Sequence, residues 1–529
     1  MIFFLTDWQS DMAHFEENAM FNVSKILNKN GLETQIVNTQ LAPFLNYFGN
    51  QFGYYNPSMI TNLLDCVLQV SGVAYTPVNL SDLALPADIE KTYTKTNVLL
   101  SKNGVMKGEV YFNDFGYVSE VRYFSKLGEE IHYYSERGYV WCKHLLDKSA
   151  KTVKRQIFDE LGQLVFTEYS NCVIIAGTYL KFFKQEIYVT YKALCIELLN
   201  KVFEKFDPIS DRIIADGSSA LTSSLLSGFP HSGSVVWLFS NDVQQDMAQI
   251  SENQVLFTKS KKLITDNAQL SKRLERNVDF KHLLDSVSYM PFYPTTLSLG
   301  ESNSFANQYV YWEIEKLDEK TQFIFLSFLK LKLALKDLCL IVDSKVKTDE
   351  LIMVQIVEDF VSQNFAINLS STEYKLVKQY YEALEKEEMT PILRELFQKA
   401  KKDNPAFDKN IKGYQFICDF EFRCDSSKSE LKRDLQKVRV FVDQRENHQF
   451  FNHSLAVSAG IPILSKRLSP YLIDKKNGLL LRDNQQMFEG IERYLKSTDK
   501  WNQNLVESVE VIENCGADEL MMKWQVELK

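Results

Sequence analysis

Short apolar runs alternate with amphipathic stretches through the first part of the chain. Residues 1–6 form an apolar run, residues 18–29 carry a helical spacing that ends at Asn30-Gly31, and ETQIVNTQ is a second apolar run. This spacing predicts a strand, a helix and a second strand. The turn after the first strand contains no G-x-G-x-x-G sequence, which excludes a dinucleotide-binding crossover of that type.

The same alternation continues after residue 187. A helical stretch, YVTYKALCIELLNKVFEKF, precedes the apolar runs DRIIADG and 235–239, and QVLFT, KLITD and SVSYM are predicted as further strands. Beyond a linker at 293–304, we expect strands in QYVYWEIE, LCLIVD, YQFICDF and VRVFVD, and helices in EKTQFIFLSFLKLKLALK and DELIMVQIVEDFVSQN. Such alternation is typical of doubly wound parallel sheets.

Residues 97–169 have a different pattern, in which a pair of bulky residues is followed by glycine four residues after its second member. The flanking positions alternate as those of strands do, and glycine at this offset suits the positive φ of a short hairpin loop. The region is therefore predicted to be an antiparallel meander of about six to eight strands. The pairs are Phe112 and Gly116, Phe124 and Gly128, Tyr134 and Gly138, and Phe158 and Gly162.

The chain is thus predicted to be an α/β protein with two Rossmann-like halves and an inserted antiparallel β-meander domain. We expect the first part of the N-terminal Rossmann-like domain at 1–96 and the inserted sheet at 97–170. The remainder of that N-terminal domain and the linker would span 171–304, and a C-terminal Rossmann-like domain 305–529. A length of 529 residues allows a separate core in each half.

Composition and charge narrow the partners that the chain can have. The net charge is −9 with acids and bases interleaved, which does not favour nucleic acid or an anionic membrane surface as the main partner. No run of about 18 apolar residues predicts a membrane-spanning helix, and the apolar start is too short for a signal peptide. The eight cysteines contain no C-x-x-C spacing, so we expect reduced thiols in a cytoplasmic protein.

The predicted meander allows two interpretations. Its aromatic residues, together with Trp141, His132 and His144, could form an exposed face suited to an extended peptide or a glycan. The sheet could instead be a structural addition without a partner of its own.

The final third carries an ordered set of motifs. An apolar strand ends at Asp443, followed by a polar loop, a helix of small residues and a Gly-Ile-Pro turn. Another strand then leads to an Asn-Gly-Leu-Leu segment ahead of an amphipathic helix. This order resembles the donor-binding half of retaining nucleotide-sugar glycosyltransferases of the GT-B fold, and the resemblance implies that fold. The matching positions are Ala456, Gly460, Pro462, Asn477, Gly478, Leu479 and Leu480.

The residues that carry the chemistry of that family are replaced here. The resemblance places its two glutamates at Asn447 and Leu455, and Glu446 fills the first position only after a shift of one residue. Leu455 cannot hydrogen-bond a ribose. Lys320 matches the lysine of the family's diphosphate-binding pair, but the arginine position falls at or next to Glu315, which would repel phosphate. The resemblance therefore implies a GT-B fold that has lost nucleotide-sugar turnover.

The loop and helix at 446–453 leave two interpretations open. Their polar groups could serve as helix caps, or they could retain contact with a sugar. A metal site is not predicted, because His448 and His453 are five residues apart and no cysteine or acidic cluster completes a ligand shell. No catalytic residue and no cofactor is predicted. The candidate carbohydrate contacts are Glu446, Asn447, His448, Phe451, His453 and Lys320.

The glycosyltransferase-like body, the Y-F-x-x-x-G units and the ending VDQRENHQFFNHSLAVSAGIPILS are together similar to the family of accessory Sec system protein Asp-one. The resemblance implies a non-catalytic component in the export of glycosylated serine-rich repeat adhesins, cytoplasmic or peripheral at the membrane through its partners. Those partners would be the second and third accessory Sec proteins, the accessory SecA ATPase and the glycosylated adhesin. Two alternatives stay open: a retaining glycosyltransferase, active alone or with a partner, that modifies the adhesin with GlcNAc, and a structural subunit without sugar contact.

Overall fold

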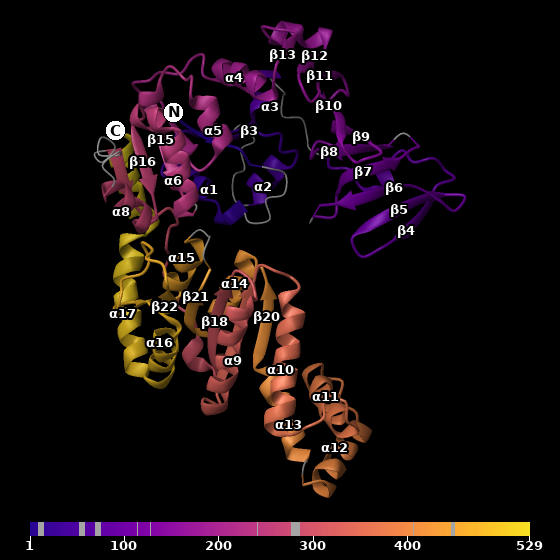
Figure 1. Ribbon diagram of the computed structural model, residues 1–529, viewed down its shortest axis with the longest axis vertical. Coiled ribbons are helices and arrows are strands. Elements are labelled where there is room, and N and C mark those ends of the chain that lie inside the picture. Colours follow the sequence, from indigo (N-terminus) through magenta and orange to yellow (C-terminus); the bar gives the residue numbers. More distant parts are fainter. Residues whose placement is uncertain are drawn as a thin grey trace.

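The computed structural model describes residues 1–8, 15–51, 59–68, 76–113, 115–126, 128–240, 242–276, 286–405, 407–445 and 450–529. A parallel sheet lies in each half, and an antiparallel sheet projects sideways from the first half (Figure 1). The predicted α/β class, with two Rossmann-like halves and an inserted antiparallel sheet, is confirmed. No helix within these ranges is both long and apolar enough to cross a membrane.

The sheet of the first half has the strand order β17-β16-β15-β14-β1-β2-β3. The order reverses between β14 and β1, as in doubly wound sheets. Every residue of β1 and β15 is buried, as expected for strands covered on both faces. The strands are β1 Ile2–Thr6, β2 Thr34–Asn38, β3 Ile60–Asn62, β14 Arg212–Asp216, β15 Val235–Phe239, β16 Lys262–Thr265 and β17 Val287–Tyr289.

The helices of the first half include one segment that we predicted as a strand. QVLFT forms α7, in which Leu256 and Phe257 are buried while Val255 is exposed. An apolar run of five residues is too short for its periodicity to separate a helix from a strand, which explains this wrong prediction. The helices are α1 Ala19–Lys29, α2 Leu45–Gln51, α3 Leu63–Leu68, α4 Tyr191–Val202, α5 Ala220–Leu226, α6 Val243–Glu252, α7 Gln254–Thr258 and α8 Ala268–Arg276.

The antiparallel sheet has ten strands in sequence order, and these run from Glu90 to Tyr188, beyond 97–170 at both ends. The four repeat glycines, Gly116, Gly128, Gly138 and Gly162, have positive φ, as predicted for hairpin loops. The strands are β4 Glu90–Tyr93, β5 Asn97–Lys102, β6 Val105–Phe112, β7 Val118–Phe124, β8 Gly128–Tyr134, β9 Val140–Asp147, β10 Thr152–Phe158, β11 Leu164–Glu168, β12 Val173–Ile175 and β13 Ile187–Tyr188.

The sheet of the second half has the order β20-β19-β18-β21-β22-β23. YQFICDF was predicted as a strand, but helix α13 continues to Cys418 and β20 begins only at Phe420. Phe416 points into the core from the helix, so its apolar character reflects a buried helical face. The strands are β18 Gln308–Ile314, β19 Leu338–Ser344, β20 Phe420–Cys424, β21 Val438–Asp443, β22 Ile463–Ser465 and β23 Gly478–Leu480.

Four helices connect β19 to β20, where one would complete the crossover. The first of them packs on the core of the second sheet, and the next two, with the start of the fourth, form an extension at the end of the molecule (Figure 1). This extension has a small core of its own around Val377, Phe397 and Phe407. The helices of the second half are α9 Glu319–Ala334, α10 Asp349–Phe365, α11 Thr372–Glu385, α12 Pro391–Asp403, α13 Phe407–Cys418, α14 Lys428–Leu435, α15 Phe451–Ser458, α16 Asn484–Lys496, α17 Thr498–Asn514 and α18 Ala517–Leu528.

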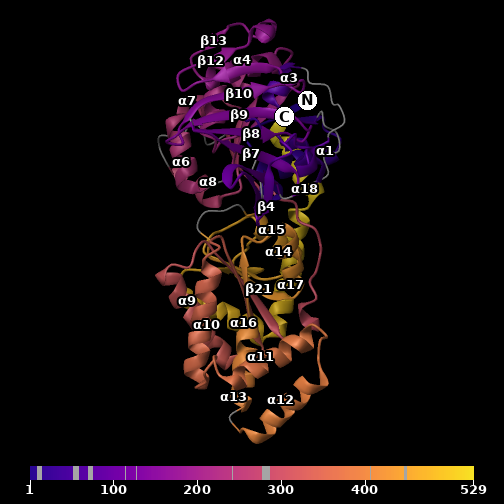
Figure 2. The same cartoon turned by 90° about the vertical axis from the view of Figure 1, so that its right-hand side faces the viewer.

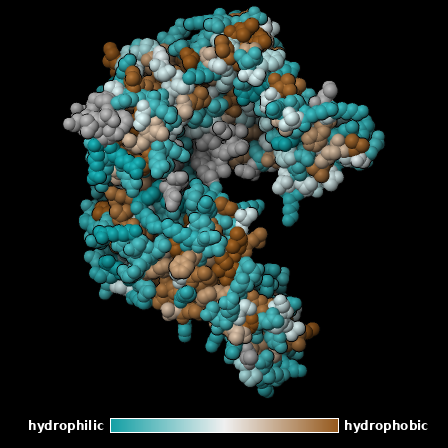
Figure 3. All heavy atoms as spheres, viewed as in Figure 1, coloured by the Kyte–Doolittle hydropathy of each residue, from teal (hydrophilic) through white to brown (hydrophobic). Residues whose placement is uncertain are grey.

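Hydrophobic side chains gather on the surface of the second half around α9 and α10 (Figure 3). Phe323 and Leu351 are 70% and 74% exposed. Leu326, Leu333 and Ile352 are also exposed on the same two helices. We call these five residues the α9–α10 patch.

Helix α18 returns to the first half and lies beside α1 (Figure 2). Trp524 is fully buried there, and its ring lies 6.4 Å from that of Phe292. The Arg212 side chain donates a hydrogen bond from Nε to the carbonyl oxygen of Leu528 at 2.9 Å. The core of the first half therefore includes residues from the last helix of the sequence.

Candidate functional site

Three carboxylates meet at the carboxyl edge of the second sheet. Glu313 on β18 lies in register with Asp343 on β19 and with Asp443 on β21. Each side chain is almost completely buried. Buried carboxylates that lie on neighbouring strands repel one another, so the edge requires a compensating cation.

Arg445 supplies that cation. Its Nη1 lies 3.7 Å from Glu313 Oε1, its Nη2 lies 3.7 Å from Asp343 Oδ2, and its backbone N–H donates to Asp443 Oδ1 at 3.0 Å. The three carboxylates raise the pKa of the guanidinium against the effect of burial. Burial raises the pKa of Glu313, although Arg445 opposes the shift. Arg467 Nη2 lies 3.4 Å from Asp443 Oδ2, so two arginines compensate the charge of this edge from within.

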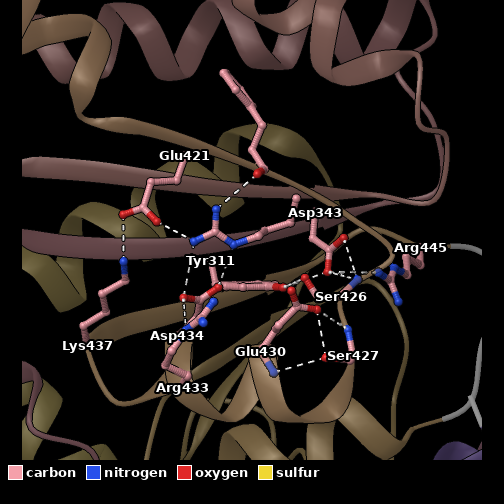
Figure 4. Close-up of polar contacts among 12 residues, drawn as sticks. Tyr311, Asp343, Glu421, Ser426, Ser427, Glu430, Arg433, Asp434, Lys437 and Arg445 are labelled. Carbon is pink, nitrogen blue, oxygen red and sulfur yellow. Dashed lines mark hydrogen bonds and ion pairs between the residues drawn. The ribbon is translucent and has the colours of Figure 1, made fainter. Parts of the chain in front are cut away.

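Tyr311 and Ser426 complete the network on one side (Figure 4). Tyr311 donates its hydroxyl hydrogen to Asp343 Oδ2 at 2.7 Å, and the backbone N–H of Ser426 donates to the same carboxylate. Burial and the charge of Asp343 raise the pKa of Tyr311 well above its usual range. Tyr311 therefore stays a hydrogen-bond donor at neutral pH.

His453 completes the network on the other side. Its Nε2 lies 2.8 Å from Asp443 Oδ2, and its Nδ1 lies 2.8 Å from Ser469 Oγ. All three side chains are buried, with His453 fully enclosed. An aspartate, a histidine and a serine in this order could activate a hydroxyl nucleophile. Here the serine is enclosed, so the arrangement holds the loop after β22 in place.

The structure places the sequence-predicted contacts in different environments. Lys320 is exposed in the first turn of α9. Phe451 is buried, with its ring 5.5 Å from that of Tyr293 and the Lys428 ammonium 5.3 Å from its centroid. His453 lies in the network described above. Glu446, Asn447 and His448 lie outside the described residues.

Sequence analysis missed the residues that dominate this edge: Glu313, Asp343, Asp443 and Arg445. A signal was present, because each carboxylate is the polar residue near the end of a predicted apolar strand, in VYWEI, LIVD and VFVD. The carboxyl ends of adjacent parallel strands meet at one edge of a sheet. Strand order and register, which decide that the three residues are neighbours, are not local properties of the sequence.

The arrangement is poorly suited to a nucleotide diphosphate. A diphosphate at this edge would lie near Glu313, Asp343 and Asp443, whose cation Arg445 is already engaged. Glu315, near the start of α9, has a buried Oε2 without a hydrogen-bond partner among the described residues. Leu455, where the resemblance placed the ribose-binding glutamate, packs against the hydrophobic core. No group of His, Cys, Asp and Glu side chains in the described ranges could hold a metal ion.

Comparison with known proteins identifies relatives over the whole chain. A family model described as accessory Sec system protein Asp-one matches residues 5–529. A protein of that description from Streptococcus gordonii is 19% identical over 528 residues, which cover 99% of this chain and 95% of the relative.

Solved structures show the same fold. The chain is similar to a structure from the complex of accessory secretory proteins 1, 2 and 3 of Streptococcus pneumoniae, with a TM-score of 0.73, 16% identity and coverage of 100% of this chain and 99% of the other. It is also similar to a structure from the Glycosylation Associate Protein complex of Streptococcus agalactiae, with a TM-score of 0.74 and 17% identity over 100% of both chains. A third similar structure is the pneumococcal O-GlcNAc transferase GtfA in complex with UDP and GlcNAc. Its TM-score is 0.65 and its identity 11%, over 100% of this chain and 98% of the other.

The likeness to GtfA shows a shared glycosyltransferase fold of the GT-B type. The family match extends over nearly every residue of the chain and agrees with the resemblance drawn from its sequence. The chain therefore belongs to the family of accessory Sec system protein Asp-one, and it is an accessory Sec component built on a GT-B fold.

Proposed function

We propose that this accessory Sec component is non-catalytic and acts as an adaptor in the export of a glycosylated serine-rich repeat adhesin. The observation that carries the proposal is the carboxyl edge of the second sheet, where Arg445 pairs with Glu313 and Asp343. Asp443 beside them pairs with Arg467. Nucleotide-sugar enzymes of this fold hold their donor at such an edge. A row of buried acids with an internal cation opposes a diphosphate instead of binding it.

The proposed protein partners are the second and third accessory Sec proteins and the accessory SecA ATPase. Complexes of accessory secretory proteins 1, 2 and 3 contain chains with the fold of this one, which supports the first two. The α9–α10 patch supports a protein partner as well, because exposed apolar side chains that gather on one surface are typical of interaction sites. We place the protein in the cytoplasm, peripheral at the membrane through these partners.

The proposed contacts with the adhesin glycan are Lys320 and the loop residues Glu446, Asn447 and His448. Lys320 is exposed and could donate a hydrogen bond to a sugar hydroxyl. Phe451 and His453, the other two candidates, are buried, so their proposed role is to hold the start of α15 in place.

Calorimetric titration of the full chain tests the proposal. We expect no heat from UDP or UDP-GlcNAc, and binding of a serine-rich peptide that carries GlcNAc. Nucleotide binding with a Kd near 1 μM, about −8 kcal/mol, would contradict the closed-edge argument and favour the glycosyltransferase alternative. Binding of neither nucleotide nor glycopeptide would favour a structural subunit.

A further inference from the structure

Helix α9 is apolar on two opposite faces. Its inner face packs in the core of the second half through Ile324, Phe325, Phe328 and Leu329, which are all buried. Its outer face carries Phe323, which is 70% exposed, on the surface where hydrophobic side chains gather (Figure 3). A helix that is apolar all round is normally covered on every side, so the outer face of α9 is expected to have a partner.

The exposed residues of this outer face follow a heptad spacing. They recur at intervals of three and four residues, as along the contact line of a coiled coil, so they form one narrow stripe on the helix. A stripe of this shape fits a second helix, which can lie along it for about four turns. We call the stripe the α9 seam; its members, all exposed, are Glu319, Phe323, Leu326, Lys330 and Leu333.

The two charged members of the α9 seam have opposite signs and flank its apolar centre symmetrically. Glu319 lies four residues before Phe323, and Lys330 lies four residues after Leu326. The two are eleven positions apart, which corresponds to about 16 Å along the helix. Neither forms an ion pair with another residue within the described ranges. A partner helix would therefore need a base opposite Glu319 and an acid opposite Lys330.

That pattern of charges is the pattern of α9 itself, followed in the opposite direction. In an antiparallel pair with its two-fold axis between residues 324 and 325, Glu319 of each copy faces Lys330 of the other. Phe323 then packs against Leu326 of the second copy, and the symmetry repeats every contact. In a parallel pair, Lys330 would face Lys330 and Glu319 would face Glu319, and these like charges would repel.

We infer that the α9 seam is an interface between two copies of this chain, which pair antiparallel through α9. The pairing goes beyond the adaptor function and does not depend on it. The interface is short, so we expect reversible association, as for interfaces below about 1,200 Å². Leu351 and Ile352, the members of the α9–α10 patch on α10, lie outside the seam and remain for the partners proposed above.

Pairing would also give the proposed function a second binding site. If each copy contacts the adhesin as proposed above, a pair presents two sites to a ligand with many glycosylated repeats. The second site then binds at a raised effective concentration, which strengthens binding without a new contact.

Sedimentation equilibrium of the full chain, from roughly 1 μM to 100 μM, tests the interface. Wild type should pass from monomer to dimer. Lys330→Glu places acids opposite acids, and Glu319→Lys places bases opposite bases, so each should raise the Kd of the dimer at least about tenfold. Lys401→Glu makes the same change of charge at an exposed position on α12 and is the matched control, which should dimerise as wild type does.

An equal mixture of Lys330→Glu and Glu319→Lys gives the sharpest result. In a mixed pair every acid of the seam again faces a base, so the mixture should dimerise although each variant alone stays monomeric. Phe323→Asp, which removes the apolar centre, should stay monomeric alone and in either mixture. Melting temperatures equal to that of wild type would show that the variants are folded.

A wild-type chain that is still monomeric at about 100 μM would overturn the inference. So would a mixture of folded variants that does not dimerise, or a dimer that Lys330→Glu leaves intact. If wild type were monomeric and Phe323→Asp abolished binding of the purified second or third accessory Sec protein, the occupant of the seam would be that protein and the inference would be wrong. Calorimetric binding of glycopeptide should be unchanged in all variants, so failure of the pairing and failure of the adaptor function are distinguishable.

Discussion

The two parallel sheets both end in buried carboxylates, but they neutralise them in different ways. In the second half a permanent cation, Arg445, lies among Glu313, Asp343 and Asp443. In the first half Asp216 accepts a hydrogen bond from the backbone N–H of Ser218, and burial together with nearby Asp7 raises its pKa to about 7.

The charge compensation at the edge of the second sheet is therefore independent of pH, whereas the charge at the edge of the first sheet should depend on pH. A guanidinium keeps its charge at any physiological pH, so the edge of the second sheet stays closed. Burial raises the pKa of Asp216 to about 7, so we expect the charge of this carboxyl to change within the physiological range. Three substitutions sharpen the contrast.

The largest effect is expected from Arg445→Met. Removal of one partner from a buried ion cluster leaves uncompensated charge and typically costs about 3–5 kcal/mol. The free energy of unfolding, measured with urea, should fall by that amount. Addition of Glu313→Gln should recover part of the loss, because one of the repelling charges is removed.

Lys320→Met is the control for this experiment, since Lys320 is exposed and such changes cost within about 0.5 kcal/mol. If Arg445→Met and Lys320→Met unfold at the same urea concentration, the second edge is not held by its arginine.

A smaller, pH-dependent effect is expected from Asp216→Asn. The folded pKa of about 7 lies above the ordinary value of 3.8. The contribution of this carboxyl to stability is therefore fully present below about pH 4 and is lost as the pH rises to 7. Between these limits the free energy of unfolding of wild type should fall by up to about 1.4 kcal/mol per pH unit. The amide in the variant cannot titrate, so the variant should lack this dependence on pH.

The measurement is the urea midpoint of wild type and Asp216→Asn at pH 5 and pH 8. Wild type should weaken more than the variant over this interval. The exposed Asp337→Asn serves as control. Parallel pH profiles for wild type and Asp216→Asn would show that the first edge is not held by protons.

The smallest effect is expected from Lys428→Met. Lys428 Nζ lies 2.8 Å from Glu16 Oε1, and this ion pair joins the two halves. Both side chains are about a quarter exposed, so screening limits the loss to about 1 kcal/mol or less. Thermal denaturation should show a difference from wild type at low salt that disappears at about 1 M salt. Lys496→Met, which breaks an ion pair within α16, is the matched control. If Lys496→Met lowers thermal stability more than Lys428→Met does, the Lys428–Glu16 pair does not link the two halves.

Local signals in the sequence predicted much of the fold. Gly116, Gly128, Gly138 and Gly162 marked the hairpins correctly, because positive φ is a requirement of single positions. The strands in LCLIVD and VRVFVD were also predicted correctly, because buried parallel strands are continuous apolar runs. QVLFT was predicted wrongly because five apolar residues fit the period of a helix and that of a strand equally well.

The site could be predicted only in part, since its residues meet through strand order. His453 could be selected as a polar residue in a loop and helix, but its pairing with Asp443 and Ser469 depends on three separate elements. Likewise, no local pattern indicated that Arg445 would face carboxylates from β18 and β19. The replacement of the family's two glutamates by Asn447 and Leu455 stays a prediction, which rests on the order of motifs in the sequence.

The return of α18 to the first half has a consequence for biosynthesis. Trp524 and Leu528 belong to the same core cluster as Phe21 and Phe292. The ribosome makes residues 1–292 long before residues 517–528, so the first half spends most of translation with part of its core uncovered. Domains usually fold one after another as they are made, but here the first half can finish only after the second. A chaperone or partner that recognises exposed apolar surface therefore has its opportunity at the α1 face while the chain is still being synthesised.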